Sequence, residues 1–83
     1  MVHHPALGER ARELLVAARA HDGKIFKVEY EEGGPLVRAG AFERTGADWG
    51  VALEELIDKG LVIYKGGSPT EHGETYEIAP GVR

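Results

Sequence analysis

The C-terminal part of the chain constrains the fold most, because a predicted helix there is followed at once by two predicted strands. Apolar residues recur at helical spacing over 49–57, and Gly60 suits the left-handed position after a helix C-terminus. Residues 61–65 follow too closely for anything but a strand that packs beside the helix. A glycine-rich, wing-like loop over 66–73 then leads to a returning strand over 75–79. This order predicts an α+β domain.

One apolar stripe defines this helix and leaves its acidic residues outside. The stripe consists of Trp49, Ala52, Leu53, Leu56 and Ile57. Thr45 or Asp48 is expected to cap the helix, because either side chain can accept a hydrogen bond from a free amide at the helix start. Lys59 lies favourably at the negative end of the helix dipole.

A second amphipathic helix is predicted near the N-terminus, beginning near Ala6. Its apolar face consists of Leu7, Ala11, Leu14, Leu15 and Ala18. The segment 21–23 is expected to end this helix, since Gly23 suits the left-handed turn that follows it. Both helices therefore present an apolar stripe to a common core.

Between the two helices the apolar period changes to alternation, which is typical of strands. A half-buried strand is predicted over 24–31, and the glycines of 32–35 allow a hairpin to a second strand over 36–42. Gly40 in that second strand indicates a bulge or the close approach of another backbone. Residues 43–47 are turn-like. On the first strand one side would carry Phe26, Val28 and Tyr30.

The length of 83 residues predicts one domain with a thin core, since such a chain buries only about 60 to 65% of its unfolded surface. We predict a flexible lead-in over 1–5, a single domain over 6–80 and a tail over 81–83. The absence of cysteine fits a reducing compartment. Apolar runs fall far short of the roughly 20 residues that span a bilayer, so no membrane contact and a cytoplasmic location are expected.

Three short motifs resemble the helix-and-wing half of winged-helix domains: ALEEL at 52–56, GLV at 60–62 and ETYEI at 74–78, the last preceded by a glycine wing. With DGKI at 22–25 and AGAF at 39–42, nearly the whole chain resembles small winged-helix-like domains that end many poorly characterised bacterial proteins. Such domains have no agreed activity. The resemblance therefore implies a fold more than a function.

One departure from that family concerns the helix-turn-helix. A DNA-reading winged helix has a separate helix between its first helix and its recognition helix. Here the corresponding region is glycine-rich and includes the β-like residues 36–42, which disfavours a helix. We therefore expect a winged-helix-like domain of two main helices and a small antiparallel sheet, as two hairpins or as a mixed hairpin plus wing, without a complete helix-turn-helix.

Charge disfavours DNA binding, because neutralisation of phosphates by Lys and Arg supplies nearly all non-specific affinity. The formal net charge is −4, and the helix that would read DNA has one basic residue, Lys59. Its acidic residues are Asp48, Glu54, Glu55 and Asp58. The alternative function, a DNA-binding transcriptional regulator, would depend on Arg10, Arg12, Arg19 and Lys65.

Metal binding and catalysis are not expected. No two histidines have the spacing of a helical metal site; they are His3, His4, His21 and His72. The chain has no cysteine, its only serine is Ser68, and no glycine-rich loop precedes a helix in phosphate-binding order. We therefore predict no enzyme activity and no cofactor.

Aromatic residues are the candidates for a binding interface. Trp49 is either a core residue, the interpretation we favour, or an interface anchor, since Trp is enriched in binding hot spots. Tyr64 and Tyr76 raise the same question. We predict a non-catalytic module that binds a protein partner or a second copy of itself, with these three residues as candidate interface residues.

Overall fold

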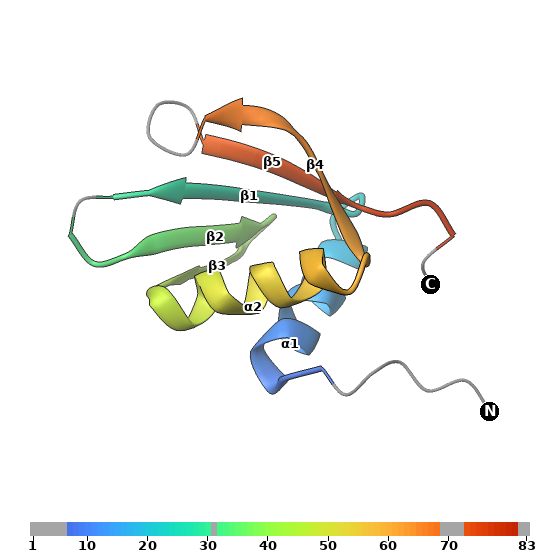
Figure 1. The fold of residues 1–83 in the computed structure, drawn as a ribbon, viewed down its shortest axis with the longest axis horizontal. Helices are drawn as coiled ribbons and strands as arrows, with labels where there is room; N and C mark the ends of the chain where they lie inside the picture. The colour runs from blue at the N-terminus through green and yellow to red at the C-terminus, as the bar shows by residue number, and fades with distance from the viewer. Residues whose placement is uncertain (1–6, 31, 69–72, 82–83) are drawn as a thin grey trace.

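The computed structural model describes residues 7–30, 32–68 and 73–81. Their elements, in chain order, are α1 (Glu9–Arg19), β1 (Lys24–Glu29), β2 (Pro35–Ala39), β3 (Phe42–Thr45), α2 (Ala47–Asp58), β4 (Val62–Ser68) and β5 (Gly73–Ile78) (Figure 1). The five strands form one antiparallel sheet in the order β3-β2-β1-β5-β4. The α+β prediction is confirmed. The predicted lead-in over 1–5, Ala6 and the tail residues 82–83 lie outside the described residues. The predicted helix start near Ala6 is wrong, because Leu7 precedes the helix, Gly8 is its N-cap and α1 begins at Glu9.

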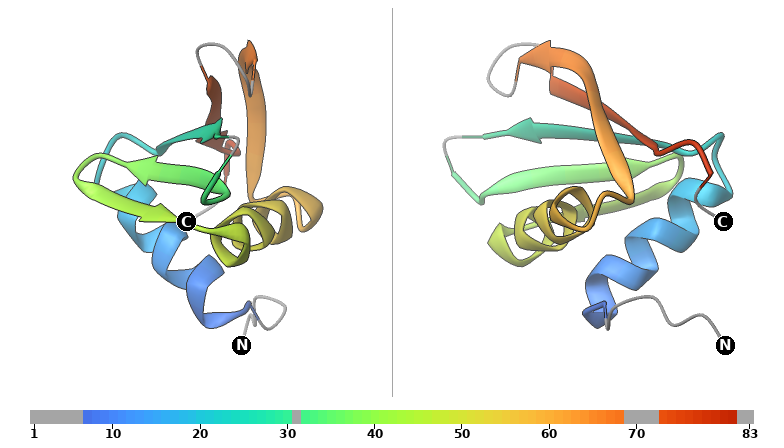
Figure 2. Two further views of the ribbon diagram at one scale, coloured as in Figure 1. Left: turned by 90° about the vertical axis from the view of Figure 1, so that its left-hand side faces the viewer. Right: turned by 45° about the vertical axis from the view of Figure 1, so that its right-hand side comes forward.

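Both helices lie on one face of the sheet and pack against each other (Figures 1 and 2). The buried residues of α1 are Ala11, Leu14, Leu15 and Ala18. Those of α2 are Gly50, Ala52, Leu53 and Leu56, with Trp49 and Ile57 partly buried beside them. The predicted stripe of α2 is confirmed, and so is that of α1 except for Leu7, which precedes the helix and is partly buried against the core. Burial of each leucine contributes roughly 1.5 to 3 kcal/mol, so these stripes supply much of the stability.

The sheet completes the core with alternate residues from its strands. On the helix-facing side the buried residues are Ile25, Val37, Ala39, Val62 and Tyr76. Phe26 and Val28 pair with Arg38 and Leu36 and share the opposite face. The alternation predicted for β1 is therefore present, and Ile25 marks its core-facing side.

The predicted strand over 36–42 is wrong, because the chain reverses within it. Gly40 and Ala41 form a two-residue hairpin turn between β2 and β3, with Ala39 paired to Phe42. Only the first of the two has a positive φ, +64°, as in a type II′ turn. Gly40 is thus neither a bulge nor an approach of another backbone, and residues 43–45 of the predicted turn belong to β3. No helix lies between α1 and α2 in the described part of that segment.

Two further predictions are wrong at the ends of elements. Neither Thr45 nor Asp48 caps α2: the N-cap is Gly46, whose amide donates to the carbonyl of Pro35 at 2.9 Å. The wing is shorter than expected, because residues 66–68 belong to β4 and pair with β5 beyond a bulge after Tyr64. Only residues 69–72 of the predicted wing lie outside the described residues.

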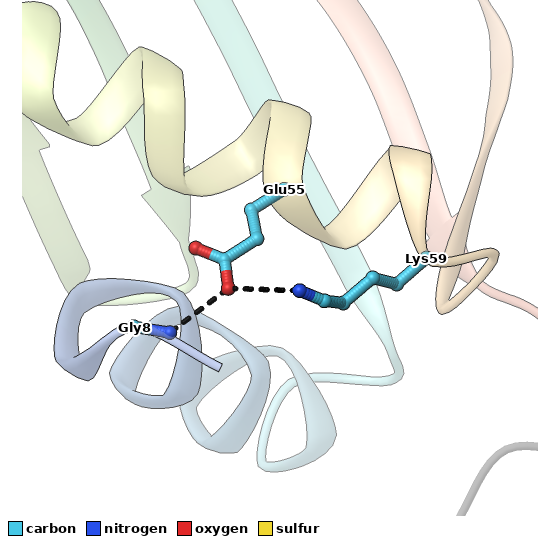
Figure 3. A network of polar contacts seen from close by, with 3 residues as sticks. All are labelled: Gly8, Glu55 and Lys59. Atoms are coloured by element: carbon cyan, nitrogen blue, oxygen red, sulfur yellow. Dashed lines mark hydrogen bonds and ion pairs between the residues drawn. The ribbon is translucent and has the colours of Figure 1, made fainter. Parts of the chain in front are cut away.

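A polar contact ties α2 to the start of α1 (Figure 3). The Glu55 carboxylate accepts a hydrogen bond from the backbone amide of Gly8 at 2.9 Å. Gly8 is the N-cap of α1, whose free amide would otherwise have no side-chain partner. Lys59, one turn further along α2, approaches the same carboxylate oxygen at 3.4 Å. Glu55 therefore performs between two helices the capping role that a local side chain usually has.

The leucine core should dominate stability. We expect Leu53→Ala to lower the free energy of unfolding by about 2 to 5 kcal/mol, because the Leu53 side chain is fully buried and its removal leaves a cavity. The matched control is Val51→Ala on the same helix, where the side chain is 65% exposed and a change within about 0.5 kcal/mol is expected. Urea denaturation measures both, and equal losses would contradict this arrangement of α2.

The Glu55 contact makes a smaller prediction. Glu55→Ala should cost about 1 kcal/mol, because it removes the acceptor of the Gly8 amide and the partner of Lys59. Glu54→Ala, an adjacent exposed acid, should change stability by less than about 0.5 kcal/mol. If the two substitutions were indistinguishable in thermal unfolding, the contact would contribute nothing to the fold.

Candidate protein-interaction surface

Phe42 and Trp49 meet where β3, α1 and the start of α2 converge. Their ring centroids lie 5.5 Å apart with an interplanar angle of 73°, an edge-to-face arrangement that favours both rings. Both side chains are partly buried and pack against the core. Trp49 therefore anchors α2 to the core and still presents part of its ring to solvent.

Two arginines border this aromatic pair. The Arg44 guanidinium lies 4.3 Å from the centroid of Phe42 and 5.8 Å from that of Trp49. Arg10 of α1 lies 5.9 Å from the Trp49 centroid and forms an ion pair with Asp48 at 3.6 Å. Cation–π contacts of this kind hold the guanidinium groups beside the rings. We call Arg10, Phe42, Arg44 and Trp49 the aromatic–arginine cluster.

An apolar groove adjoins this cluster between α1 and β3. It has a volume of about 410 Å³ and is lined by Arg12, Glu13, Val16, Ala17 and Phe42. Val16 is 59% exposed, so a large apolar side chain on the outer flank of α1 remains in contact with solvent. We call this the α1–β3 groove. Its apolar floor, bordered by Arg12 and Glu13 and adjoining Arg44, is suited to an apolar group with charged neighbours.

The groove meets β3 at Phe42, and β3 is the first strand of the sheet order, so its outer edge is free. Antiparallel partners alternate between pairs that exchange hydrogen bonds and pairs that do not. The bond from the Gly46 amide to Pro35 sets this alternation, so Phe42 and Arg44 bond toward β2. The backbone groups of Glu43 and Thr45 therefore point away from the sheet. The Glu43 carbonyl accepts a bond from the Arg44 side chain at 2.9 Å.

Tyr64 and Tyr76, predicted together with Trp49, lie on β4 and β5 at the other end of the sheet order. Their rings contact edge to face at 5.7 Å. Tyr76 is only 6% exposed and donates to the Glu74 carboxylate at 2.9 Å, so it is a core residue. Tyr64 is 53% exposed and its hydroxyl donates to the carbonyl of Gly67. The structure does not bring the three predicted interface residues together.

The predicted nucleic-acid residues are also divided. Arg10, Arg12 and Arg19 are exposed on α1, whereas Lys65 is on β4 at the far edge of the sheet. Arg10 is paired with Asp48. The exposed residues of α2 that flank this region are Asp48, Val51, Glu54 and Asp58.

The sheet face opposite the helices carries a second apolar patch. Phe26, Val28 and Leu36 are half-buried there. The Arg38 guanidinium lies 5.0 Å from the Phe26 ring centroid and pairs with Glu43 at 3.6 Å. A cavity of about 470 Å³ opens at one end of this face, lined in part by His21, Lys24 and Arg38. Within this patch, Arg38 and Glu43 already neutralise each other across two strands.

Comparison with known protein families, with curated proteins and with solved structures finds no match to this chain. Among the described residues no helix is long and apolar enough to cross a membrane. Nor do these residues contain a group of three or more metal-ligating His, Asp or Glu side chains. The surface must therefore be interpreted from its own geometry.

The sequence identified Trp49 and Arg10 but missed Phe42, Arg44 and Val16 as members of one surface. Phe42 and Arg44 were assigned to the end of a strand and to a turn, where their shared orientation cannot be recognised. Their two-residue spacing on β3 is the signal that places both on the helix-facing side. Val16 follows Arg12 by one helical turn, which puts both on the outer flank of α1.

Tyr76 makes the fold sensitive to alkaline pH. Burial, together with the hydrogen bond and the negative charge of Glu74, raises the pKa of Tyr76 well above its ordinary value of about 10. Above pH 10 the unfolded chain loses this proton while the folded chain keeps it, so the free energy of unfolding falls as pH rises. The contribution is about 1.4 kcal/mol per pH unit.

We therefore expect the wild-type protein to lose stability more steeply between about pH 10 and 11.5 than Tyr76→Phe does. Tyr64→Phe serves as the control for loss of a tyrosine hydroxyl, because it retains Tyr76 and should retain the steeper loss. Chemical denaturation over this pH range measures the slopes. Parallel curves for the wild type and Tyr76→Phe would contradict the buried position of this hydroxyl.

Proposed function

We propose that this chain is a cytoplasmic, non-catalytic protein-interaction module whose binding surface is the aromatic–arginine cluster with the adjoining α1–β3 groove. The observation that carries the proposal is the convergence of Trp49, Phe42 and two arginines beside an apolar groove. Tryptophan, other aromatic residues and arginine are the side chains most enriched in protein interfaces. The non-catalytic part rests on the sequence, which has no cysteine and a single serine.

The fold of this module is proposed to be a winged-helix derivative. Its support is the order α2, β4 and β5, in which a helix is followed directly by an antiparallel hairpin that resembles a wing. In this proposal the hairpin β2–β3 occupies the place of the middle helix. The change matters because it puts the edge strand β3 beside α1, where a helix-turn-helix has no strand edge.

Charge supports a protein partner over DNA. The helix that a winged helix would insert into a groove exposes Asp48, Glu54 and Asp58, and a duplex would meet repulsion there. DNA could approach α1 instead, through Arg12 and Arg19, with Lys65 too far along the sheet order to join them. We keep this DNA-binding regulator as the alternative, because these exposed arginines form no ion pair with the described residues.

The exposed valines of the two helices offer a matched test. We expect a photo-crosslinking amino acid in place of Val16 to yield a covalent protein adduct in cells, because Val16 lies in the α1–β3 groove. The same amino acid in place of Val51, a similarly exposed valine among the acids of α2, should give little adduct. The mass of the Val16 adduct distinguishes a second copy from another protein. Equal adducts at both positions, or none at Val16, would contradict the proposed surface.

A binding assay with random duplex DNA decides between the two functions. The protein-interaction proposal predicts no binding beyond background at low or moderate salt. The alternative predicts binding that weakens steeply with salt, and simultaneous substitution of Arg10, Arg12 and Arg19 by Gln should flatten that dependence. Salt-sensitive binding that the triple substitution abolishes would replace the proposed function with the alternative.

A further inference from the structure

We propose that the partner recognised at this surface is an extended, acidic segment of another protein that pairs with the free edge of β3 and lies over the α1–β3 groove. This inference rests on the proposed function and specifies its partner. The segment would extend the sheet beyond β3 by one strand, and α1 would form the floor beneath it. Strand addition of this kind obtains affinity from main-chain hydrogen bonds and specificity from alternate side chains.

The backbone of β3 offers the main-chain hydrogen bonds that strand addition requires. Glu43 and Thr45 direct their amides and carbonyls outward, and both residues are exposed. Three of these four groups have no partner among the described residues, and the fourth, the Glu43 carbonyl, accepts the Arg44 side chain. That contact is exposed, so an incoming carboxylate can draw the guanidinium away at little cost.

The side chains around this edge determine which residues an added strand should carry. Residues of the added strand that point to the helix side would lie over Val16, Ala17 and Phe42, which favours apolar groups. That side is bordered by two bases, Arg12 and Arg44, and by one acid, Glu13. The two arginines form no ion pair with the described residues, so the local excess of positive charge favours carboxylates between those apolar groups. On the opposite side the neighbours are Glu43 and Thr45, which favour uncharged residues. The preferred segment thus alternates apolar and acidic residues on one side with neutral polar residues on the other.

A second copy of this chain does not fit the same edge. In an antiparallel pair of β3 strands, the residues opposite each other must belong to the same face of the sheet. Only two registers meet this condition and join three residues of each strand. One register sets Glu43 opposite Glu43, and the other sets Arg44 opposite Arg44. Like charges directly opposite each other are destabilising. The edge of β3 therefore disfavours pairing with β3 of a second copy and favours a different, acidic strand.

The other edge of the sheet is less suited to an added strand. β4 carries a bulge between Tyr64 and Gly66, and the exposed Lys65 lies at that bulge. Bulges and edge lysines are among the features that proteins use to prevent strand addition, as are short edge strands and other exposed charges. β3 has no bulge and no lysine, but it is four residues long and exposes Glu43 and Arg44, so an added strand must match these charges.

A fluorescent peptide tests the proposal on the full chain. The probe alternates threonine with leucine and aspartate (Thr-Leu-Thr-Asp-Thr-Leu-Thr-Asp-Thr), and the matched control has lysine in place of aspartate. We expect the aspartate peptide to bind at least about tenfold more tightly in fluorescence anisotropy, with amide chemical-shift changes confined to β3 and to 12–17 of α1. Equal affinity for the two peptides, or shifts centred on the opposite sheet face, would overturn the proposal.

Two pairs of variants test the mode of binding. Glu43→Pro removes an outward amide that does not bond to β2, so the fold should be retained while affinity falls by about tenfold or more. An aspartate peptide with N-methylated alternate amides should lose binding to the wild type, and this test stands even where Glu43→Pro fails to fold. Arg12→Gln should weaken binding and its salt dependence, whereas Arg19→Gln, the same change at the end of α1 and outside the groove, should not.

Unchanged binding by Glu43→Pro and by the N-methylated peptide would overturn strand addition. The crosslinking result distinguishes this failure from failure of the proposed function. If no acidic peptide binds but Val16 still yields a specific adduct, the surface binds a protein of another kind and the present inference is wrong. If no acidic peptide binds and Val16 yields no adduct, both the present inference and the proposed function are wrong.

Discussion

The fold depends on one apolar layer between two short helices and one face of the sheet. Leu14, Leu53 and Leu56 are fully buried in this layer, and Ile25 and Val37 meet them from the strands. A domain of this length has no second core, so each helix must bury its whole apolar stripe in this layer. The outer flanks of α1 and α2 are therefore left to set the surface properties, and they differ in character: α1 is mixed and carries arginines, and α2 is acidic.

The hairpin β2–β3 determines what this core can support at the surface. Because the chain turns back at Gly40, Phe42 and Arg44 lie on the same face as the core-facing residues of β2; Phe42 reaches α1, and Arg44 reaches the Trp49 ring. Trp49, in the first turn of α2, closes the cluster from the other side. A helix in this position would have satisfied its own backbone groups, whereas a short edge strand leaves those of Glu43 and Thr45 directed outward. The same turn thus produces both the aromatic contact and the free edge.

Both helices and their buried faces could be predicted from the sequence, because a 3.6-residue period is a local property that the core then confirms at Leu14 and Leu53. The strand boundaries were less accessible. A glycine within an alternating run indicates a bulge or a turn equally well, and only pairing of Ala39 with Phe42 decides between them. Trp49 was recognisable as a candidate by its residue type, but its neighbours Phe42 and Arg10 come from other elements, and no local pattern reports such contacts.

Backbone amide hydrogen exchange along β3 is the decisive measurement for this docking edge, because the strand must be bonded on one side and free on the other. The amides of Phe42 and Arg44, which bond toward β2, should exchange slowly, whereas those of Glu43 and Thr45 should exchange fast in the isolated protein. Protection of Glu43 and Thr45 equal to that of their neighbours would mean that the edge is already occupied, and it would contradict the assignment of this strand as a docking edge.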